Sequence, residues 1–184
     1  PGHHAESDLV GGFCYFNNSA IAAQMLLDQF ERVAIIDVDV HHGNGTQQIF
    51  YHRDDVFTLS LHADPRRFYP FFWGYAEETG NGAGLGCNLN IPLERGTEDG
   101  PYLDELNHAL ERVNDFQPDA LVISLGLDAS IDDPFQGLRI TPDGFGNIGR
   151  RLAALAKPTL LVQEGGYMSD NLSLNLQAVL AAFQ

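Results

Sequence analysis

Short apolar runs alternate with stretches of helical periodicity along the chain. Five runs rich in β-branched and leucine side chains predict buried strands: Val33–Val40, Val56–Leu61, Asn88–Ile91, Ala120–Leu125 and Thr159–Gln163. Apolar residues recur at helical spacing in four other segments, and we expect helices over residues 20–30, 103–113, 145–155 and 176–183. The triplet Thr141-Pro142-Asp143 is typical of a helix start, because a hydroxyl can cap the helix and proline fits its first position.

The alternation of strands and helices predicts an α/β fold with a mostly parallel sheet flanked by helices. The predicted strands are apolar on both faces, which is typical of a parallel sheet covered by helices on each side. In such sheets the functional site lies beyond the carboxyl ends of the strands. Residues 63–87 form the longest irregular stretch, and a loop of that length inside a compact domain is usually functional.

Composition narrows the class of protein. The length of 184 residues predicts one domain, and a hydrophobic content of 44% rules out a disordered chain. The net charge of −15 disfavours nucleic acid and anionic membranes as partners. No apolar run approaches the roughly 20 residues of a membrane span. Two cysteines, Cys14 and Cys87, cannot form a disulfide framework, so we expect a cytoplasmic protein.

Polar side chains collect where the first predicted strand ends. Asp37, Asp39 and His41 alternate with valines, so an extended backbone places their three side chains on one side. An Asp-x-His pair at a strand end can offer an oxygen and a nitrogen to one metal ion. Taken alone, the same residues also fit a turn followed by a helix cap.

Other strand ends add to this set. Asp128 follows the fourth predicted strand, and together Asp39, His41 and Asp128 offer two oxygens and one nitrogen. Three protein ligands leave a fourth position open for water, which is typical of a catalytic zinc site. After the last strand, paired glycines predict a sharp turn that carries Tyr167 outward, although a partly packed tyrosine is the simpler alternative. Taken alone, the pair His3-His4 fits a surface loop or the remnant of a tag.

Five segments stand out as motifs: Pro1–Ala5, Gly12–Asn18, Asp37–Thr46, Ser124–Asp128 and Glu164–Tyr167. Together they resemble the histone deacetylase and acetylpolyamine amidohydrolase superfamily. The segments occur in the order of the family and span nearly the whole chain. Tyr69–Gly80 and Asp132–Pro134 look most like the bacterial acetylpolyamine branch. The resemblance places His3 in the middle of a catalytic domain, so residues 1–184 are expected to form a single, incomplete domain whose N-terminal part is missing.

The resemblance implies an arginase/deacetylase-like fold with a catalytic zinc, or iron(II) in its place, at the carboxyl edge of the sheet. Motif matching makes Asp39, His41 and Asp128 the zinc ligands. It makes His3 and His4 the tandem catalytic histidines, with His4 as general base and acid. The remaining catalytic positions are then Asp37, which would orient His3, Asn44, which would hold His4, and Tyr167, which would donate its hydroxyl to the developing oxyanion.

The resemblance also implies a substrate tunnel and a second cation. Phe13 and Tyr69 match the aromatic walls that grip an acylated lysine-like chain, and Gly12 lines the tunnel beside them. A structural potassium site maps to Asp37, Asp39 and Ser60, with backbone oxygens of His41 and Leu61. The aromatic neighbours of Tyr69 are expected to pack as a small core under the loop; they are Phe68, Phe71, Phe72 and Trp73. Cys14 is expected to be a small core residue rather than a nucleophile.

The expected function is zinc-dependent hydrolysis of acetyl or other acyl groups from acetylated polyamines or related amines. The expected partner is therefore a small cationic acylated amine, with no nucleic acid and no membrane, while a homo-oligomer cannot be read from the sequence. One alternative is a protein lysine deacetylase on the same scaffold. Another is a non-catalytic, metal-binding fragment.

Overall fold

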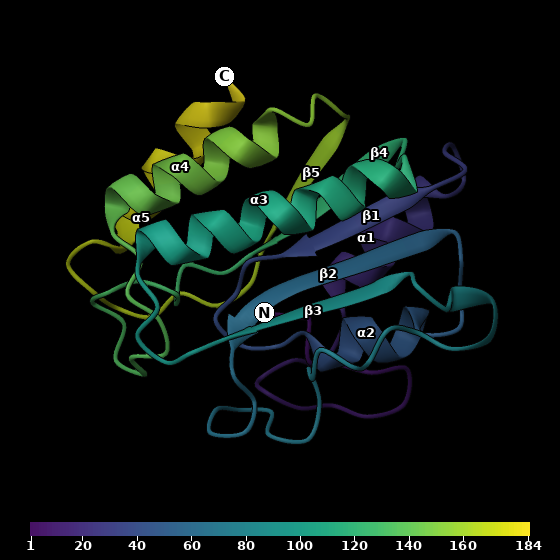
Figure 1. The fold of residues 1–184 in the computed structure, drawn as a ribbon, viewed down its shortest axis with the longest axis horizontal. Helices are drawn as coiled ribbons and strands as arrows, with labels where there is room; N and C mark the ends of the chain where they lie inside the picture. Colours follow the sequence, from purple (N-terminus) through teal and green to yellow (C-terminus); the bar gives the residue numbers. More distant parts are fainter.

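The computed structural model describes residues 1–184 as a five-stranded sheet with helices on both faces (Figure 1). The strands are β1 (Val33–Asp37), β2 (Val56–Ala63), β3 (Asn88–Leu93), β4 (Ala120–Leu125) and β5 (Thr159–Gln163). They lie in the order β3-β2-β1-β4-β5, and every neighbouring pair is parallel. The predicted α/β fold with a parallel sheet is thus confirmed.

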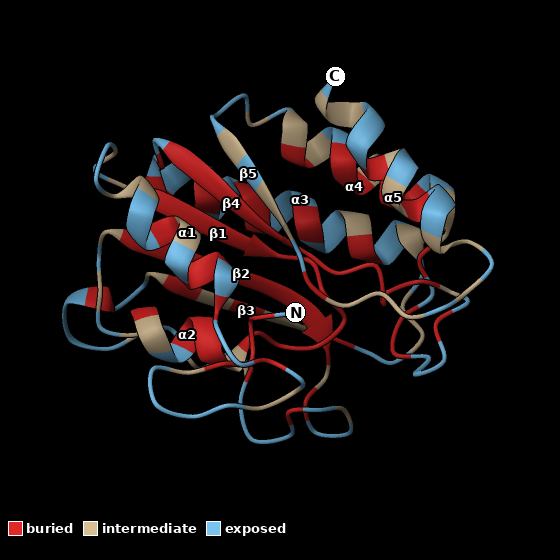
Figure 2. Ribbon diagram, turned by 180° about the vertical axis from the view of Figure 1, so that it is seen from behind, coloured by how far each residue is buried: buried red, intermediate tan, exposed pale blue.

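Helices cover the two faces of the sheet unequally. One face carries α1 (Asn18–Leu26) and α2 (Asn44–Phe50), and the other carries α3 (Asp99–Phe116), α4 (Pro142–Ala153) and α5 (Leu172–Leu180) (Figures 1 and 2). Short 3₁₀ turns complete the set at Gly82–Gly84 and Ala181–Phe183. The helix start predicted at Thr141 is confirmed, because its hydroxyl accepts a hydrogen bond from the backbone N–H of Gly144 at 3.1 Å. None of the helices has the length and apolar composition needed to cross a bilayer.

The core consists of two apolar clusters, one on each face of the sheet. Ala34 and Ile36 pack into the larger cluster with α3 and α4, whereas Val33 and Ile35 pack into the smaller one with α1 and α2. Alternate residues of β1 therefore pack into opposite cores, which explains why its first four residues, 33–36, are all apolar. Figure 2 shows the central strands buried and the edge strand β5 only partly covered.

The first strand is shorter than predicted. It ends at Asp37 rather than Val40, because side-chain carboxylates take over the backbone N–H groups that follow. Oδ1 of Asp37 accepts from the N–H of Asp39 at 3.0 Å, and Oδ1 of Asp39 accepts from the N–H of His41 at 2.8 Å. These local bonds compete with the sheet ladder and turn the chain out of it.

Helix α2 was not predicted from the sequence. It has seven residues, too few for a clear helical period, and its N-cap Gly43 offers no side-chain hydrogen bond. The helix nevertheless matters for the site, since its first residue is Asn44. The backbone N–H groups of Gly45 and Thr46 both donate to the carbonyl oxygen of His3, at 3.0 and 3.1 Å.

The loop between β2 and β3 is irregular, as predicted, apart from its short 3₁₀ turn. The expected small core under it is wrong for Phe71, Phe72 and Trp73, which are exposed. Phe68 alone of these neighbours packs against the larger cluster. Polar bonds hold the loop instead: Oε2 of Glu78 accepts from Nε2 of Gln47 at 2.7 Å and from a loop backbone N–H at 2.9 Å.

Candidate active site

The candidate active site lies where the strand order reverses. Strand β1 has β2 on one side and β4 on the other, and in doubly wound sheets ligands bind at the carboxyl ends of such a pair. Strand β1 ends at Asp37, the segment after it carries Asp39 and His41, and the segment after β4 carries Asp128; all four are buried. The two segments touch at Gly126, where a Cβ would lie 2.4 Å from the Cα of Asp39.

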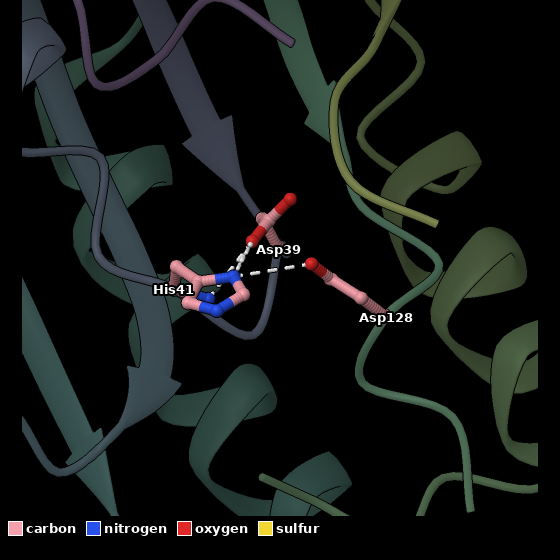
Figure 3. Close-up of side chains that lie close together, drawn as sticks. All are labelled: Asp39, His41 and Asp128. Atoms are coloured by element: carbon pink, nitrogen blue, oxygen red, sulfur yellow. Dashed lines mark hydrogen bonds and ion pairs between the residues drawn. The ribbon is translucent and has the colours of Figure 1, made fainter. Parts of the chain in front are cut away.

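Three side chains from these segments converge (Figure 3). Nδ1 of His41 lies 3.1 Å from Oδ1 of Asp39 and 3.1 Å from Oδ2 of Asp128. The ligand atoms of all three residues lie within 4.8 Å of one another. Two carboxylate oxygens and one imidazole nitrogen that face a common point could hold a metal ion. For zinc, three such ligands leave a position open for water or substrate.

The electrostatics of the cluster fit a cation. Burial and the negative charge of Asp39 raise the pKa of Asp128 to about 7. Burial alone would lower the pKa of His41, but hydrogen bonds to Asp128 and Asp39 raise it to about 10. Both pKa values rise because the negative charges of Asp39 and Asp128 are buried together, and a bound proton is the positive charge that offsets them. A divalent cation would supply the missing positive charge, so the residues present fit a metal ion.

The tandem histidines lie beside this cluster, each with its own partner. Their ring centroids are 4.1 Å apart. Nδ1 of His3 lies 2.7 Å from Oδ2 of Asp37, and Nδ1 of His4 lies 2.8 Å from Oδ1 of Asn44. The structure therefore brings together both pairs that the resemblance implied.

The two histidines differ in charge. Burial alone would lower the pKa of His3, but the charges of Asp37 and Asp39 outweigh it and raise this pKa well above its usual value. Burial and the positive charge of His3 lower the pKa of His4 to about 3. At neutral pH His4 is therefore neutral and able to accept a proton, which favours His4 over His3 as general base.

The backbone of the histidine segment is tied to the end of β5. Oε2 of the buried Glu164 accepts hydrogen bonds from the N–H groups of Gly2 and His3, at 2.5 and 3.1 Å. The next N–H group, that of Gly165, donates to Oδ2 of Asp39 at 2.7 Å. The sequence presented Glu164 only as part of a motif, and nothing in its spacing indicated that it holds the histidines.

A cavity of about 580 Å³ opens onto these groups. Its walls include six of the residues that the sequence singled out: His4, Gly12, Phe13, His41, Tyr69 and Tyr167. The ring of Tyr69 meets the ring of His4 edge-on at 4.9 Å between centroids. Gly12 has a positive φ of +52°, and a Cβ there would lie 2.1 Å from Cδ2 of His4. Glycine is therefore required for this wall to reach the histidine.

Tyr167 stands at the same cavity on the glycine turn. Gly166 has a φ of +148°, as the expected sharp turn requires. Burial, followed by the charges of Asp128 and Asp39, raises the pKa of Tyr167 to about 12. The phenol thus keeps its proton at neutral pH and remains a hydrogen-bond donor.

The expected potassium ligands come from neighbouring strands. The β1–β2 register pairs Asp37 with Ser60, so the two side chains lie at the same level of the sheet. The hydroxyl of Ser60 also lies 2.8 Å from Nδ1 of His62. Potassium at this place stays a prediction.

Several residues of the cavity were missed from the sequence. Phe68 stacks on the ring of His41 at 5.0 Å, and Phe135 contacts the rings of His41 and Tyr167 edge-on at 5.8 and 4.8 Å. Arg67 and Arg95 also line the cavity. Phe68 belongs to a visible aromatic stretch, but Phe135 and the arginines carry no periodicity or spacing that could have marked them.

Fold and site together place the chain among α/β proteins with a cluster of carboxylates and an imidazole, able to bind a metal ion, at the switch point of a parallel sheet. The chain belongs to the histone deacetylase domain family, whose sequence profile matches residues 1–183. This confirms the resemblance drawn from the five sequence segments.

Individual relatives support the family assignment. Acetylpolyamine amidohydrolase 1 of Pseudomonas aeruginosa is 50% identical over 185 residues, which cover 100% of this chain and 54% of the relative. Histone deacetylase 18 of Arabidopsis thaliana is 42% identical over 94% of this chain and 27% of its own length. The crystal structure of acetylpolyamine aminohydrolase from Burkholderia pseudomallei superposes with a TM-score of 0.97 at 48% identity, covering 100% of this chain and 54% of the other. The chain thus spans about half the length of its bacterial relatives.

Proposed function

We propose that the protein is a zinc-dependent amidohydrolase that removes acetyl groups from acetylated polyamines or related small cationic amines. The observation that carries this proposal is the convergence of Asp39, His41 and Asp128 beside a cavity that also exposes a neutral His4 and Tyr167. Two acetylpolyamine amidohydrolases among the relatives, at 48% and 50% identity, support the choice of substrate class.

A zinc ion held by Asp39, His41 and Asp128 would polarise the amide carbonyl and lower the pKa of water toward about 7. His4 then takes the proton of the attacking water at Nε2, since its Nδ1 is bonded to Asn44. The Tyr167 hydroxyl donates to the carbonyl oxygen as negative charge develops there. His4 finally returns its proton to the nitrogen of the leaving amine.

The other residues of the site hold these groups in place. Asp37 fixes the ring of His3, and burial together with the positive charge of His3 keeps His4 neutral. Phe13 and Tyr69 present aromatic surface on which the methylene chain of the substrate packs by burial of apolar area. We further propose the site around Asp37 and Ser60 for a structural potassium ion.

A protein lysine deacetylase is the second candidate. Arg67 and Arg95 line the same cavity, and their guanidinium groups repel a substrate arm that carries further positive charge. The plant relative named histone deacetylase 18 is consistent with a peptide substrate for this fold. Because of these arginines, acetylated polyamines and acetyl-lysine peptides should be compared directly as substrates.

The proposal is tested on the full-length protein that contains this chain, loaded with one zinc ion. We expect acetate release from N-acetylputrescine, loss of activity on chelation and recovery on addition of zinc. His4→Gln should keep the zinc but lose at least about 100-fold in kcat. Failure of the zinc-loaded protein to cleave any acylated amine or acetyl-lysine peptide would refute hydrolase activity. A clear preference in kcat/KM for peptides would instead select the second candidate.

A further inference from the structure

A second hydrogen bond to Asn44 is not used by the mechanism described so far. Nδ2 of Asn44 donates to Oε1 of Glu6 at 3.1 Å, while Oδ1 of the same amide faces Nδ1 of His4 at 2.8 Å. These are the two side-chain bonds that the Asn44 amide makes in the structure. Glu6, Asn44 and His4 therefore form a chain of three groups that ends at the proposed general base.

The direction of each bond in this chain is set by chemistry. An ionised carboxylate can only accept, so Glu6 holds the NH₂ end of the Asn44 amide toward itself. The carbonyl end must then face His4, and a carbonyl oxygen also can only accept. Nδ1 of His4 consequently carries the hydrogen, and in a neutral imidazole this leaves the lone pair on Nε2.

An amide at position 44 needs a partner such as Glu6 to fix which of its two ends faces His4. A carboxylate there would accept from Nδ1 in either rotation of its side chain. The amide of Asn44, in contrast, can turn through 180° and present its NH₂ to His4. The hydrogen of His4 would then move to Nε2, the atom that has to receive the proton of water.

The backbone around Glu6 is fixed well enough for this task. The N–H of Glu6 donates to the carbonyl oxygen of Leu9 at 2.9 Å, and the N–H of Ala5 donates to that of Gly2 at 3.0 Å. The start of α2, which carries Asn44, is bonded to the carbonyl of His3. Glu6 and Asn44 thus approach each other from two segments that are already joined.

We propose that Glu6 is a positioning residue that, through the amide of Asn44, keeps His4 in the tautomer with a free Nε2. The proposal rests on the proposed function, in which His4 is the general base. It concerns the placement of one hydrogen atom, and this placement can be measured without any substrate.

The first experiment measures the tautomer in the zinc-loaded, full-length protein labelled with ¹⁵N in its histidine rings. In the wild type we expect His4 to show a protonated Nδ1 and a bare Nε2. In Glu6→Ala the signals of His4 should move toward the opposite tautomer. Asp8→Ala is the matched control, because it removes an exposed carboxylate two residues away without touching Asn44. Unchanged His4 signals in Glu6→Ala would overturn the proposal, even if the protein proves to be a deacetylase.

The second experiment measures turnover of N-acetylputrescine, or of an acetyl-lysine peptide if that is the better substrate. Glu6→Ala should lower kcat about tenfold with KM within twofold, and Asp8→Ala should leave both unchanged. In the Asn44→Asp background, where a carboxylate sets the tautomer alone, Glu6→Ala should change kcat less than twofold. An equal loss in both backgrounds would show that Glu6 does not act through Asn44 and would overturn the proposal. Inactivity of the wild type would refute the proposed function while leaving the tautomer measurement to decide the role of Glu6.

Discussion

Gly165 lies against both carboxylates of the metal cluster, and replacing it with alanine should remove the metal site. A Cβ at this position would lie 2.1 Å from Oδ2 of Asp128 and 2.6 Å from Oδ2 of Asp39. A carbon and an oxygen that are not bonded approach to roughly 3.3 Å, so the Asp128 oxygen must move by roughly 1 Å. Metal–ligand distances tolerate only about 0.2 Å. We therefore expect Gly165→Ala to weaken zinc binding by at least about 100-fold.

Zinc affinity would be measured by competition with a chromophoric chelator, alongside acetate release and thermal unfolding of the metal-free protein. The matched control is Gly146→Ala in α4, where the nearest atom to the new Cβ lies 3.5 Å away. This helical substitution should leave zinc binding unchanged and add up to about 1 kcal/mol of stability. Overpacking at Gly165 should cost about 1–3 kcal/mol, so the fold survives in both variants. Zinc affinity of Gly165→Ala within threefold of the wild type would refute the reasoning.

Three further predictions concern the oxyanion donor, the rim charge and a buried histidine. Tyr167→Phe should lower kcat by about 10²–10³ with zinc affinity unchanged, and a loss under tenfold would reject the hydroxyl as donor. Arg67→Ala should raise kcat/KM for a cationic acetylpolyamine about threefold relative to a neutral acetyl-lysine peptide, an effect that salt should diminish. Burial lowers the pKa of His62 to about 4, below the value near 6.5 of an unfolded chain. The unfolded state therefore gains a proton first as pH falls, and His62 should account for about 2 kcal/mol of stability lost between pH 7 and pH 5. Urea unfolding at both pH values should show a loss about 2 kcal/mol smaller in His62→Gln than in the wild type, because His4 and the other buried histidines contribute equally to both.

Much of the fold could be predicted because the decisive signals are local. Each central strand is buried on both faces and therefore consists mostly of apolar residues, and Thr141 caps its helix through its own side chain. Helix α2 is too short for a period and has no side-chain cap, so no local signal marks it. The early end of β1 was missed because it depends on the carboxylates of Asp37 and Asp39 bonding their own backbone.

The candidate site also has a part that local sequence signals predict and a part that only the folded structure reveals. Asp39, His41 and Asp128 could be proposed together because parallel strands end at one edge of a sheet. The sequence does not reveal that β1 and β4 are neighbours, since strand order is decided by how helices pack on both faces. Phe135 and Glu6 were missed for a related reason, because their contacts depend on how irregular segments fold onto the site.

The proposed metal ligands follow two neighbouring strands, and this position would link metal supply to folding. His41 and Asp128 are 87 residues apart in sequence, and they meet only after β4 has taken its place beside β1. The unfolded chain therefore offers no assembled site, so a metal ion acts as a ligand of the folded state alone. At a free concentration 1,000 times its dissociation constant, such a ligand adds about 4 kcal/mol to the free energy of unfolding. Metal supply would then set how long the folded chain survives proteolysis as well as how much of it is active.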